Sequence, residues 1–230
     1  MNEASPATFD FGTVATSYDS WYQTPMGRVY DRLEKRGVEQ LLPGPGTGRE
    51  MLEVGTGTGH WSSYFSERGF TVTGVDISPA MVNVARGKKI KRASFQVADA
   101  HRLPFDDGRF DAAAAVTTLE FVRSPDVVLK EMVRCTRRPG GVIIIGVLNA
   151  LAVINQRRKE SGESPYNAAR LFSPGELKAL LAPFGETDII TVAFVPGCSL
   201  LLPLARFGDV IARLLCMQSG AFLLGRVTLQ

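Results

Sequence analysis

The residues with the clearest chemical potential form a glycine-rich run, Glu53–Gly59, which reads Glu-Val-Gly-Thr-Gly-Thr-Gly. It follows a predicted short strand, Met51–Val54, and precedes a predicted helix that begins at His60. Glycines let the backbone turn tightly and approach a ligand that a Cβ atom would exclude, and a helix start offers free N–H groups. The spacing is GxGxG, and His60 stands where a GxGxxG dinucleotide motif has its third glycine. The Glu53 carboxylate would repel a pyrophosphate but suits a cationic group.

Two carboxylates follow the loop at the ends of the next predicted strands. Asp76 directly follows the strand Thr71–Val75, and at that position a carboxylate can accept hydrogen bonds from both hydroxyls of an adenosine ribose. Asp99 follows the strand Ser94–Ala98 and can accept from an adenine amino group, while the backbone of Ala100 meets the edge of the ring. The pattern predicts an adenosine-type ligand. An ordinary helix-capping role for Asp76 stays open.

Strands alternate with helices over most of the chain, which predicts an α/β fold with a mainly parallel sheet covered on both faces. The other predicted strands are Phe110–Val116, Val142–Val147, Asp188–Val195 and Phe222–Val227. Helices are expected over about Gly27–Leu42, His60–Arg68, Pro79–Arg86, Pro125–Arg137 and Pro174–Leu181. The last three follow Ser-Pro pairs, which supply an N-cap and a first-turn proline.

Composition limits the classes of function. A chain of 230 residues with 45% hydrophobic and 21% charged residues fits a single domain over residues 1–230. A net charge of +3 is too small to indicate a nucleic-acid partner, and the only basic cluster, Arg86–Arg92, is expected to be a solvated loop. Cys135, Cys198 and Cys216 are widely spaced, so we predict no disulfide framework, no metal site and a reduced, cytoplasmic setting. No transmembrane segment is predicted, because the longest apolar stretch is interrupted by prolines. Peripheral membrane contact stays open, as does the choice between a monomer and a homodimer.

Five motifs, taken together and in order, resemble those of the class I S-adenosylmethionine (SAM)-dependent methyltransferases. The small-molecule enzymes of ubiquinone and menaquinone biosynthesis (methyltransferase type 11) are the most similar in style. The motifs are Glu53–Gly59, Gly74–Met81, Asp99–Phe105, Phe110-Asp111 and Arg138–Gly141. The resemblance implies a Rossmann-like, doubly wound sheet of seven strands whose last two strands form an antiparallel hairpin. It also implies SAM as the cofactor and S-adenosylhomocysteine as its product.

The resemblance further assigns roles to single residues. Glu53 would lie near the methionine end of SAM, Asp76 on the ribose and Asp99 on the adenine, with Ile77 and Met81 against the faces of the ring. The aromatic segment near the N-terminus resembles one that closes over the cofactor in this family, which would bring Tyr18 to the sulfonium and Arg28 to the SAM carboxylate. An alternative is that these aromatic residues only pack the first helix onto the sheet. The expected cofactor-binding residues are Tyr18, Arg28, Glu53, Gly55, Thr56, Gly57, Gly59, Asp76, Ile77, Met81, Asp99, Ala100 and Thr117.

The catalytic residues are less well defined. Methyl transfer needs a general base only if the nucleophile must lose a proton. Glu120, in the segment after the fourth strand, and His60, at the start of a helix, are the two candidates, and structural roles for both stay open. The absence of an Asn/Asp-Pro-Pro-Tyr motif after that strand disfavours methylation of DNA adenine or glutamine.

Three segments are expected to wall the acceptor pocket: a helical lid over residues 1–45 and insertions at 149–169 and 197–220. The second insertion is rich in leucine, which favours a small, apolar or lipid- or quinone-like acceptor; a core-facing helix is the alternative. Two other functions stay open. One is a methyltransferase-like SAM-binding module without turnover, and the other is an NAD(P)-dependent oxidoreductase.

Overall fold

Seven strands form one sheet in the computed structural model, which describes residues 7–44, 48–195, 205–215 and 217–230. Their order is β3-β2-β1-β4-β5-β7-β6. β7 runs antiparallel to β5 and β6, and the other neighbouring strands are parallel. The strands are β1 (Glu50–Val54), β2 (Thr71–Asp76), β3 (Ala93–Val97), β4 (Ala112–Val116), β5 (Val142–Leu148), β6 (Gly185–Val192) and β7 (Phe222–Leu229). The predicted sheet and its C-terminal antiparallel hairpin are confirmed.

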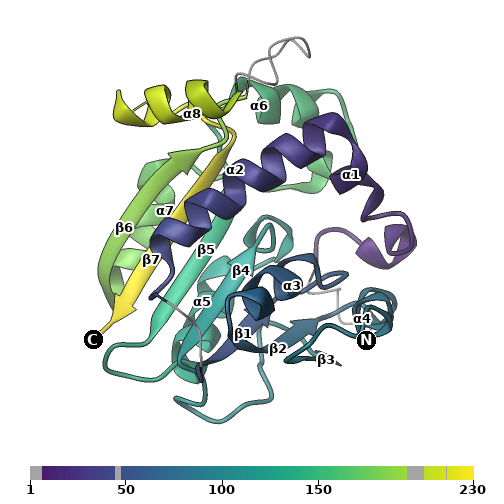
Figure 1. Cartoon of the computed structure of the whole chain (residues 1–230), viewed down its shortest axis with the longest axis vertical. Coiled ribbons are helices and arrows are strands. Elements are labelled where there is room, and N and C mark those ends of the chain that lie inside the picture. The colour runs from purple at the N-terminus through teal and green to yellow at the C-terminus, as the bar shows by residue number, and fades with distance from the viewer. Residues whose placement is uncertain (1–6, 45–47, 196–204, 216) are drawn as a thin grey trace.

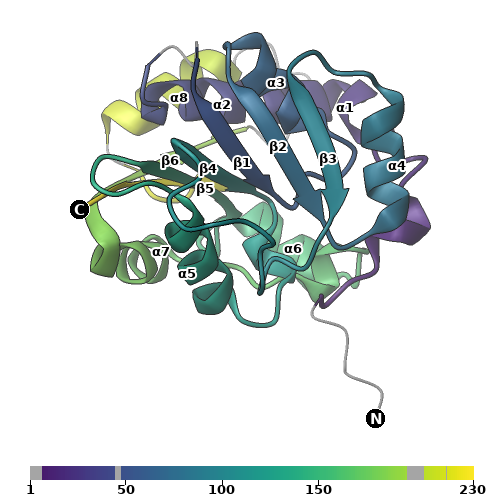
Figure 2. The ribbon, with the colours of Figure 1, turned by 90° about the horizontal axis from the view of Figure 1, so that it is seen from below.

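Helices cover both faces of this sheet (Figure 1, Figure 2). α2, α3 and α8 lie on one face and α5 and α7 on the other. The α-helices are α1 (Ser20–Gln23), α2 (Pro25–Leu41), α3 (His60–Glu67), α4 (Pro79–Gly87), α5 (Pro125–Cys135), α6 (Val153–Glu160), α7 (Pro174–Leu181) and α8 (Ala205–Leu214). Short 3-10 helices are η1 (Phe11–Val14), η2 (Leu119–Phe121), η3 (Tyr166–Ala168) and η4 (Ala182–Phe184).

The helix starts follow from the Ser-Pro pairs. The Ser78 hydroxyl accepts from the Met81 N–H, and Ser173 forms a reciprocal capping box with Glu176. Ser124 makes no such side-chain bond, so the start of α5 relies on Pro125, whose fixed φ suits the first turn.

Small residues in β4 let the layers approach each other. Ala112 to Ala115 are fully buried, and they alternate between the hydrophobic cores on the two faces of the sheet. Alanine side chains leave room there for larger neighbours such as Phe65 on one face and Met132 on the other. The central strands are therefore held rigidly, and their carboxyl ends can position side chains.

The structure differs from the sequence predictions at several boundaries. β6 was expected at Asp188–Val195 but runs from Gly185 to Val192, because Gly185 already pairs with Leu229 and Ala193 adopts a positive φ of 64°. The expected strand at Phe110 begins at Ala112, since Phe110 makes only an isolated bridge. The segment 149–169 contains α6 and η3, and the described part of 197–220 contains α8.

Cys135 is a buried free thiol, whereas Cys198 and Cys216 lie outside the described residues. No helix in the described part of the chain is long and apolar enough to cross a membrane.

A buried ring in β7 tests this packing. Phe222 fills the space beside Gly146, where a Cβ atom would lie 2.8 Å from the ring. Replacing Phe222 with Ala should lower the free energy of unfolding by about 3–5 kcal/mol, because it removes transfer energy and leaves a cavity. Phe207→Ala is the matched control, since that ring is 67% exposed, and it should change stability by less than about 0.5 kcal/mol. Urea denaturation measures both, and equal effects would contradict the packing described.

Candidate active site

A cavity of about 660 Å³ lies at the carboxyl ends of β1, β2 and β4, where open α/β sheets bind ligands. Five segments line it: the glycine loop, the turn into α4, the residues after β3, the residues after β4, and the N-terminal segment around η1. Of the residues predicted to bind the cofactor, those on the lining are Tyr18, Gly55, Gly57, Asp76, Ile77, Met81, Asp99, Ala100 and Thr117. Those not on the lining are Arg28, Glu53, Thr56 and Gly59.

The glycine loop adopts a backbone that other residues would strain. Gly55, Gly57 and Gly59 have positive φ values of 71°, 52° and 80°. A Cβ atom at Gly55 would clash with the Thr118 side chain, whereas one at Gly57 would meet nothing. Gly57 thus presents bare backbone to the cavity, as a close ligand approach requires.

Glu53 supports this loop from beneath. Its buried carboxylate accepts from Thr56 Oγ1 at 3.1 Å and from the Ser62 hydroxyl, and burial raises its pKa to about 7. These contacts explain why neither Glu53 nor Thr56 lines the cavity. The contact with the methionine end that the resemblance implied for Glu53 stays a prediction.

Asp76 joins the glycine loop to the turn into α4. Its Oδ2 accepts from the Gly57 N–H at 2.8 Å, and its Oδ1 accepts from the Ser78 N–H at 2.9 Å. Both oxygens keep a lone pair, so the carboxylate can still accept from a ligand hydroxyl. Ile77 beside it is 43% exposed, which offers an apolar surface to a flat ring.

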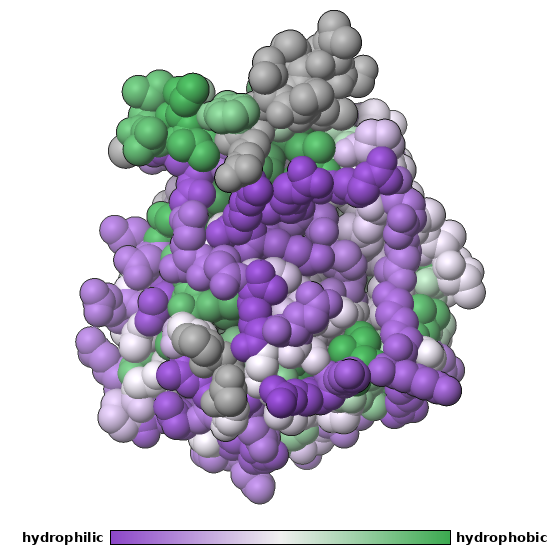
Figure 3. Space-filling model, viewed as in Figure 1, coloured by the Kyte–Doolittle hydropathy of each residue, from purple (hydrophilic) through white to green (hydrophobic). Residues whose placement is uncertain are grey.

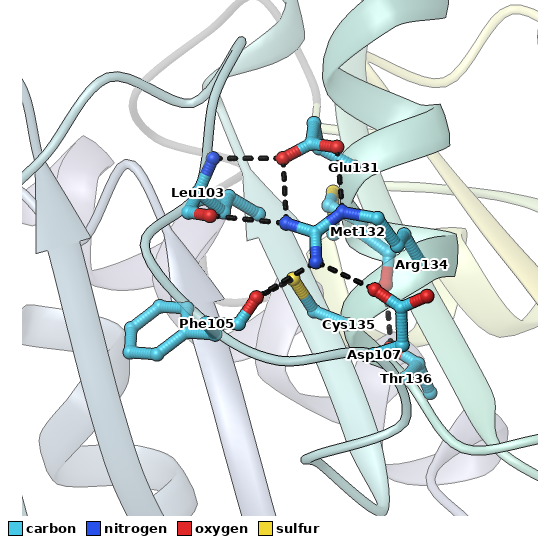
Figure 4. Close-up of polar contacts among 8 residues, drawn as sticks. All are labelled: Leu103, Phe105, Asp107, Glu131, Met132, Arg134, Cys135 and Thr136. Carbon is cyan, nitrogen blue, oxygen red and sulfur yellow. Dashed lines mark hydrogen bonds and ion pairs between the residues drawn. The ribbon is translucent and has the colours of Figure 1, made fainter.

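Asp99 is positioned through a network that the sequence did not predict. It accepts from the His101 N–H at 2.9 Å, and the loop that follows is fastened to α5 by Arg134. The guanidinium donates to Phe105 O at 2.7 Å and Leu103 O at 3.0 Å and pairs with Glu131 (Figure 4). Hydrogen bonds from Arg134 lower the pKa of Glu131, so this pair stays charged.

The charges on the lining fit a cationic cofactor. The acidic residues that line the cavity are Asp10, Asp76 and Asp99, and no Lys or Arg occurs among the described lining residues. A pyrophosphate would find no side-chain cation there, whereas a sulfonium and an ammonium would find carboxylates. The acidic side chains of the lining therefore fit SAM better than NAD.

Comparison with known proteins identifies the relatives of this chain. A family model described as a methyltransferase domain matches residues 52–145. An uncharacterized protein of Methanocaldococcus jannaschii, MJ1123, is 30% identical over 78% of this chain and 82% of its own length. Demethylmenaquinone methyltransferase of Beutenbergia cavernae is 36% identical over 59% of this chain and 55% of its own length. A Thermotoga maritima structure, described as a SAM-dependent methyltransferase and possible histamine N-methyltransferase, has a TM-score of 0.75 at 25% identity and covers 96% of this chain and 98% of its own. The chain belongs to the SAM-dependent methyltransferases.

The N-terminal segment of the methyltransferase closes one side of the cavity. The Phe11 ring lies edge-on to Phe121 at 4.8 Å and to Tyr18 at 6.1 Å, so it bridges the segment to the residues after β4. Arg28 donates to the Gln23 carbonyl, away from the lining, and its predicted contact with the SAM carboxylate stays a prediction.

Arg158 of α6 ties this N-terminal segment to the insertion 149–169. Its guanidinium lies over the rings of Tyr166, Trp21 and Tyr30, at 4.7, 5.4 and 5.7 Å from their centroids. Residues 1–45 and 149–169, two of the segments expected to wall the acceptor pocket, are thus linked through the Arg158 guanidinium.

Both catalytic candidates lie off the lining. Glu120 is 1% exposed; its Oε1 accepts from the Leu148 N–H at 2.7 Å, and its Oε2 has no hydrogen-bond partner in the described structure. Burial raises the Glu120 pKa to about 8. His60 Nε2 lies 2.6 Å from Asp31 Oδ1 and 3.1 Å from Lys35 Nζ, so that nitrogen is already engaged. A catalytic role for His60 stays a prediction.

Asp76→Ala should weaken SAM binding by about 1–3 kcal/mol, because the ribose hydroxyls and the Gly57 N–H would lose an acceptor. Isothermal titration calorimetry measures the change. Asp126→Ala, an exposed aspartate on α5, is the control and should bind SAM as the wild type does. An unchanged dissociation constant for Asp76→Ala would show that Asp76 does not bind the ribose of SAM.

Arg134→Lys tests the network in Figure 4. Lysine keeps the charge but cannot bond Glu131, Leu103 and Phe105 together, so the Asp99 loop should loosen and SAM affinity should fall by about 1 kcal/mol. Lys130→Ala on the same helix is the control, because its ion pair is exposed. A lower free energy of unfolding with unchanged SAM affinity would show that Arg134 stabilises the fold without positioning the cofactor site.

Proposed function

We propose that this SAM-dependent methyltransferase methylates a small acceptor with an apolar body, lipid-like or quinone-like in character. The observation that carries the proposal is the group of apolar side chains on the cavity lining, Phe9, Phe11, Phe121 and Val122. Aromatic and aliphatic walls of this kind favour apolar ligands, with a few polar groups fixing their orientation.

The lack of lysine and arginine on the described lining supports the same class. An acceptor whose phosphate or carboxylate entered the cavity would find no lysine or arginine among the described lining residues to compensate its charge. The name of the demethylmenaquinone methyltransferase relative, which indicates a quinone-type acceptor, agrees with this reasoning.

The chain would orient the reactants, exclude water from them and supply a proton acceptor. When bound, SAM would supply an electrophilic methyl group on a positively charged sulfur, with S-adenosylhomocysteine as the leaving group when the C–S bond breaks. Asp76 and the glycine loop would hold the cofactor, and Phe11, Tyr18 and Phe121 would exclude water from the reacting atoms. We propose that Glu120, which lies off the lining but next to Phe121 on it, accepts the proton of a hydroxyl or activated carbon once its unpartnered Oε2 turns toward the cavity.

Glu120→Gln isolates this role, since the amide oxygen can still accept from Leu148. Turnover should fall at least about 100-fold, the lower end expected for a general base, while SAM affinity stays unchanged. Wild-type turnover should rise with pH as a group with a pKa of about 8 ionises, and the Gln variant should lose this dependence. Equal turnover and equal pH dependence for the two proteins would show that Glu120 has only a structural role.

The same variant has a second readout in unfolding. The pKa of Glu120 is about 8 in the folded chain and about 4.5 in the unfolded chain, so the folded chain holds this proton more tightly. The free energy of unfolding is therefore highest below pH 4.5, and this contribution is lost as the pH rises through about 8. Glu120→Gln should therefore gain stability relative to the wild type across this window. A constant difference would mean that Glu120 is not a buried acid with a raised pKa.

An acceptor panel tests the substrate class. Purified enzyme and methyl-labelled SAM would be incubated with an alkylated hydroquinone and with the same compound carrying a phosphate. We expect label in the apolar compound and little in its phosphorylated counterpart. Transfer only to charged acceptors would contradict the proposal, and SAM binding without transfer to any acceptor would favour a binding module.

A further inference from the structure

α8 presents an apolar face to the outside of the molecule. Phe207, Val210, Ile211 and Leu214 follow the spacing i, i+3, i+4, i+7, which places them on one face of the helix. Val210 is 51% exposed and Leu214 is 77% exposed. Figure 3 shows this helix as a continuous hydrophobic region beside hydrophilic surface. The usual arrangement of a surface helix, with its apolar side inward, is reversed here.

The inward face of α8 explains why the helix keeps this orientation. Asp209 is buried and accepts from the Phe194 N–H at 3.0 Å, and Ala205 and Ala212 are buried beside it. Arg213 bonds to Gln40 of α2. A polar anchor and small side chains therefore fix the helix with its large apolar side chains outward.

A second apolar region lies at the same end of the molecule. Leu151, Val153 and Ile154, at the start of α6, are exposed, and the next turn carries the exposed Arg157. In Figure 1, α6 and α8 both lie near the top of the molecule.

The geometry points to the surface of a phospholipid bilayer as the partner of this face, with α8 lying in the interface. A helix of this length offers a strip about 15 Å long and about 10 Å wide, far less than the ~800 Å² that each partner brings to a standard protein interface. A bilayer needs no matching surface, and a short helix with apolar and cationic residues suits its interface.

The charges around α8 favour an anionic bilayer. Its one acidic residue, Asp209, is buried, Arg213 lies in its last turn, and Arg157 of α6 is exposed. Cations beside an apolar face attract anionic headgroups. A second copy of the chain would instead bring like charges together at a two-fold contact.

Vesicle flotation tests this inference with the full chain. The probes are vesicles of phosphatidylcholine and vesicles of phosphatidylcholine with phosphatidylglycerol. The test variant combines Phe207→Ser, Ile211→Ser and Leu214→Ser, and the matched control is Val127→Ser, an exposed apolar residue of α5. Wild type and control should float with the anionic vesicles, and the triple variant should bind at least tenfold more weakly. Added salt should weaken the wild type's binding.

Three results would overturn the inference. The wild type could fail to bind either vesicle, or the triple variant could bind as well as the wild type. Sedimentation could instead reveal a dimer that the triple variant loses, without vesicle binding. Calorimetry with S-adenosylhomocysteine checks that the triple variant is folded, because none of its substitutions line the cavity. The inference does not depend on the identity of the acceptor, so its failure would leave the proposed function intact.

Discussion

The hydrogen bonds that Asp76 accepts from Gly57 and Ser78 hold the site together, because they join the two turns that leave β1 and β2. The glycine loop has a left-handed backbone at each of its three glycines and makes few contacts of its own on the cavity side. A carboxylate between the turns fixes their separation, and Glu53 fixes the loop from below through Thr56 and Ser62. The cofactor surface is thus fixed by contacts within the chain, and such contacts lower the ordering cost of binding.

The same arrangement explains the electrostatics of the cavity. Its acidic residues lie on the cavity lining, whereas Arg134 fastens a loop and Arg158 lies among aromatic rings. The described lining therefore attracts positive charge and offers no lysine or arginine to a phosphate. Glu53 and Glu120, buried nearby, both have raised pKa values, so added negative charge in this region is costly.

Much of the fold could be predicted from the sequence, because the signals were local. Glycines, Ser-Pro pairs and apolar strands identified the sheet and most of its helices, and the ends of the strands identified Asp76 and Asp99. Contacts between distant segments left no such signal. Arg134 looks like any exposed helix arginine in the sequence, and only the fold brings Leu103 and Phe105 to it. The inward orientation of the Glu53 side chain depends on its hydrogen bond with Ser62, in the first turn of α3. The outward apolar face of α8 depends on the hydrogen bond that Asp209 accepts from Phe194.

The central claim is that the cavity at the carboxyl ends of β1, β2 and β4 is a SAM site. Calorimetric titration of the purified protein with S-adenosylhomocysteine and, separately, with NADH tests it most directly. The account predicts saturable one-to-one binding of S-adenosylhomocysteine and no measurable binding of NADH. Tight NADH binding without S-adenosylhomocysteine binding would contradict it.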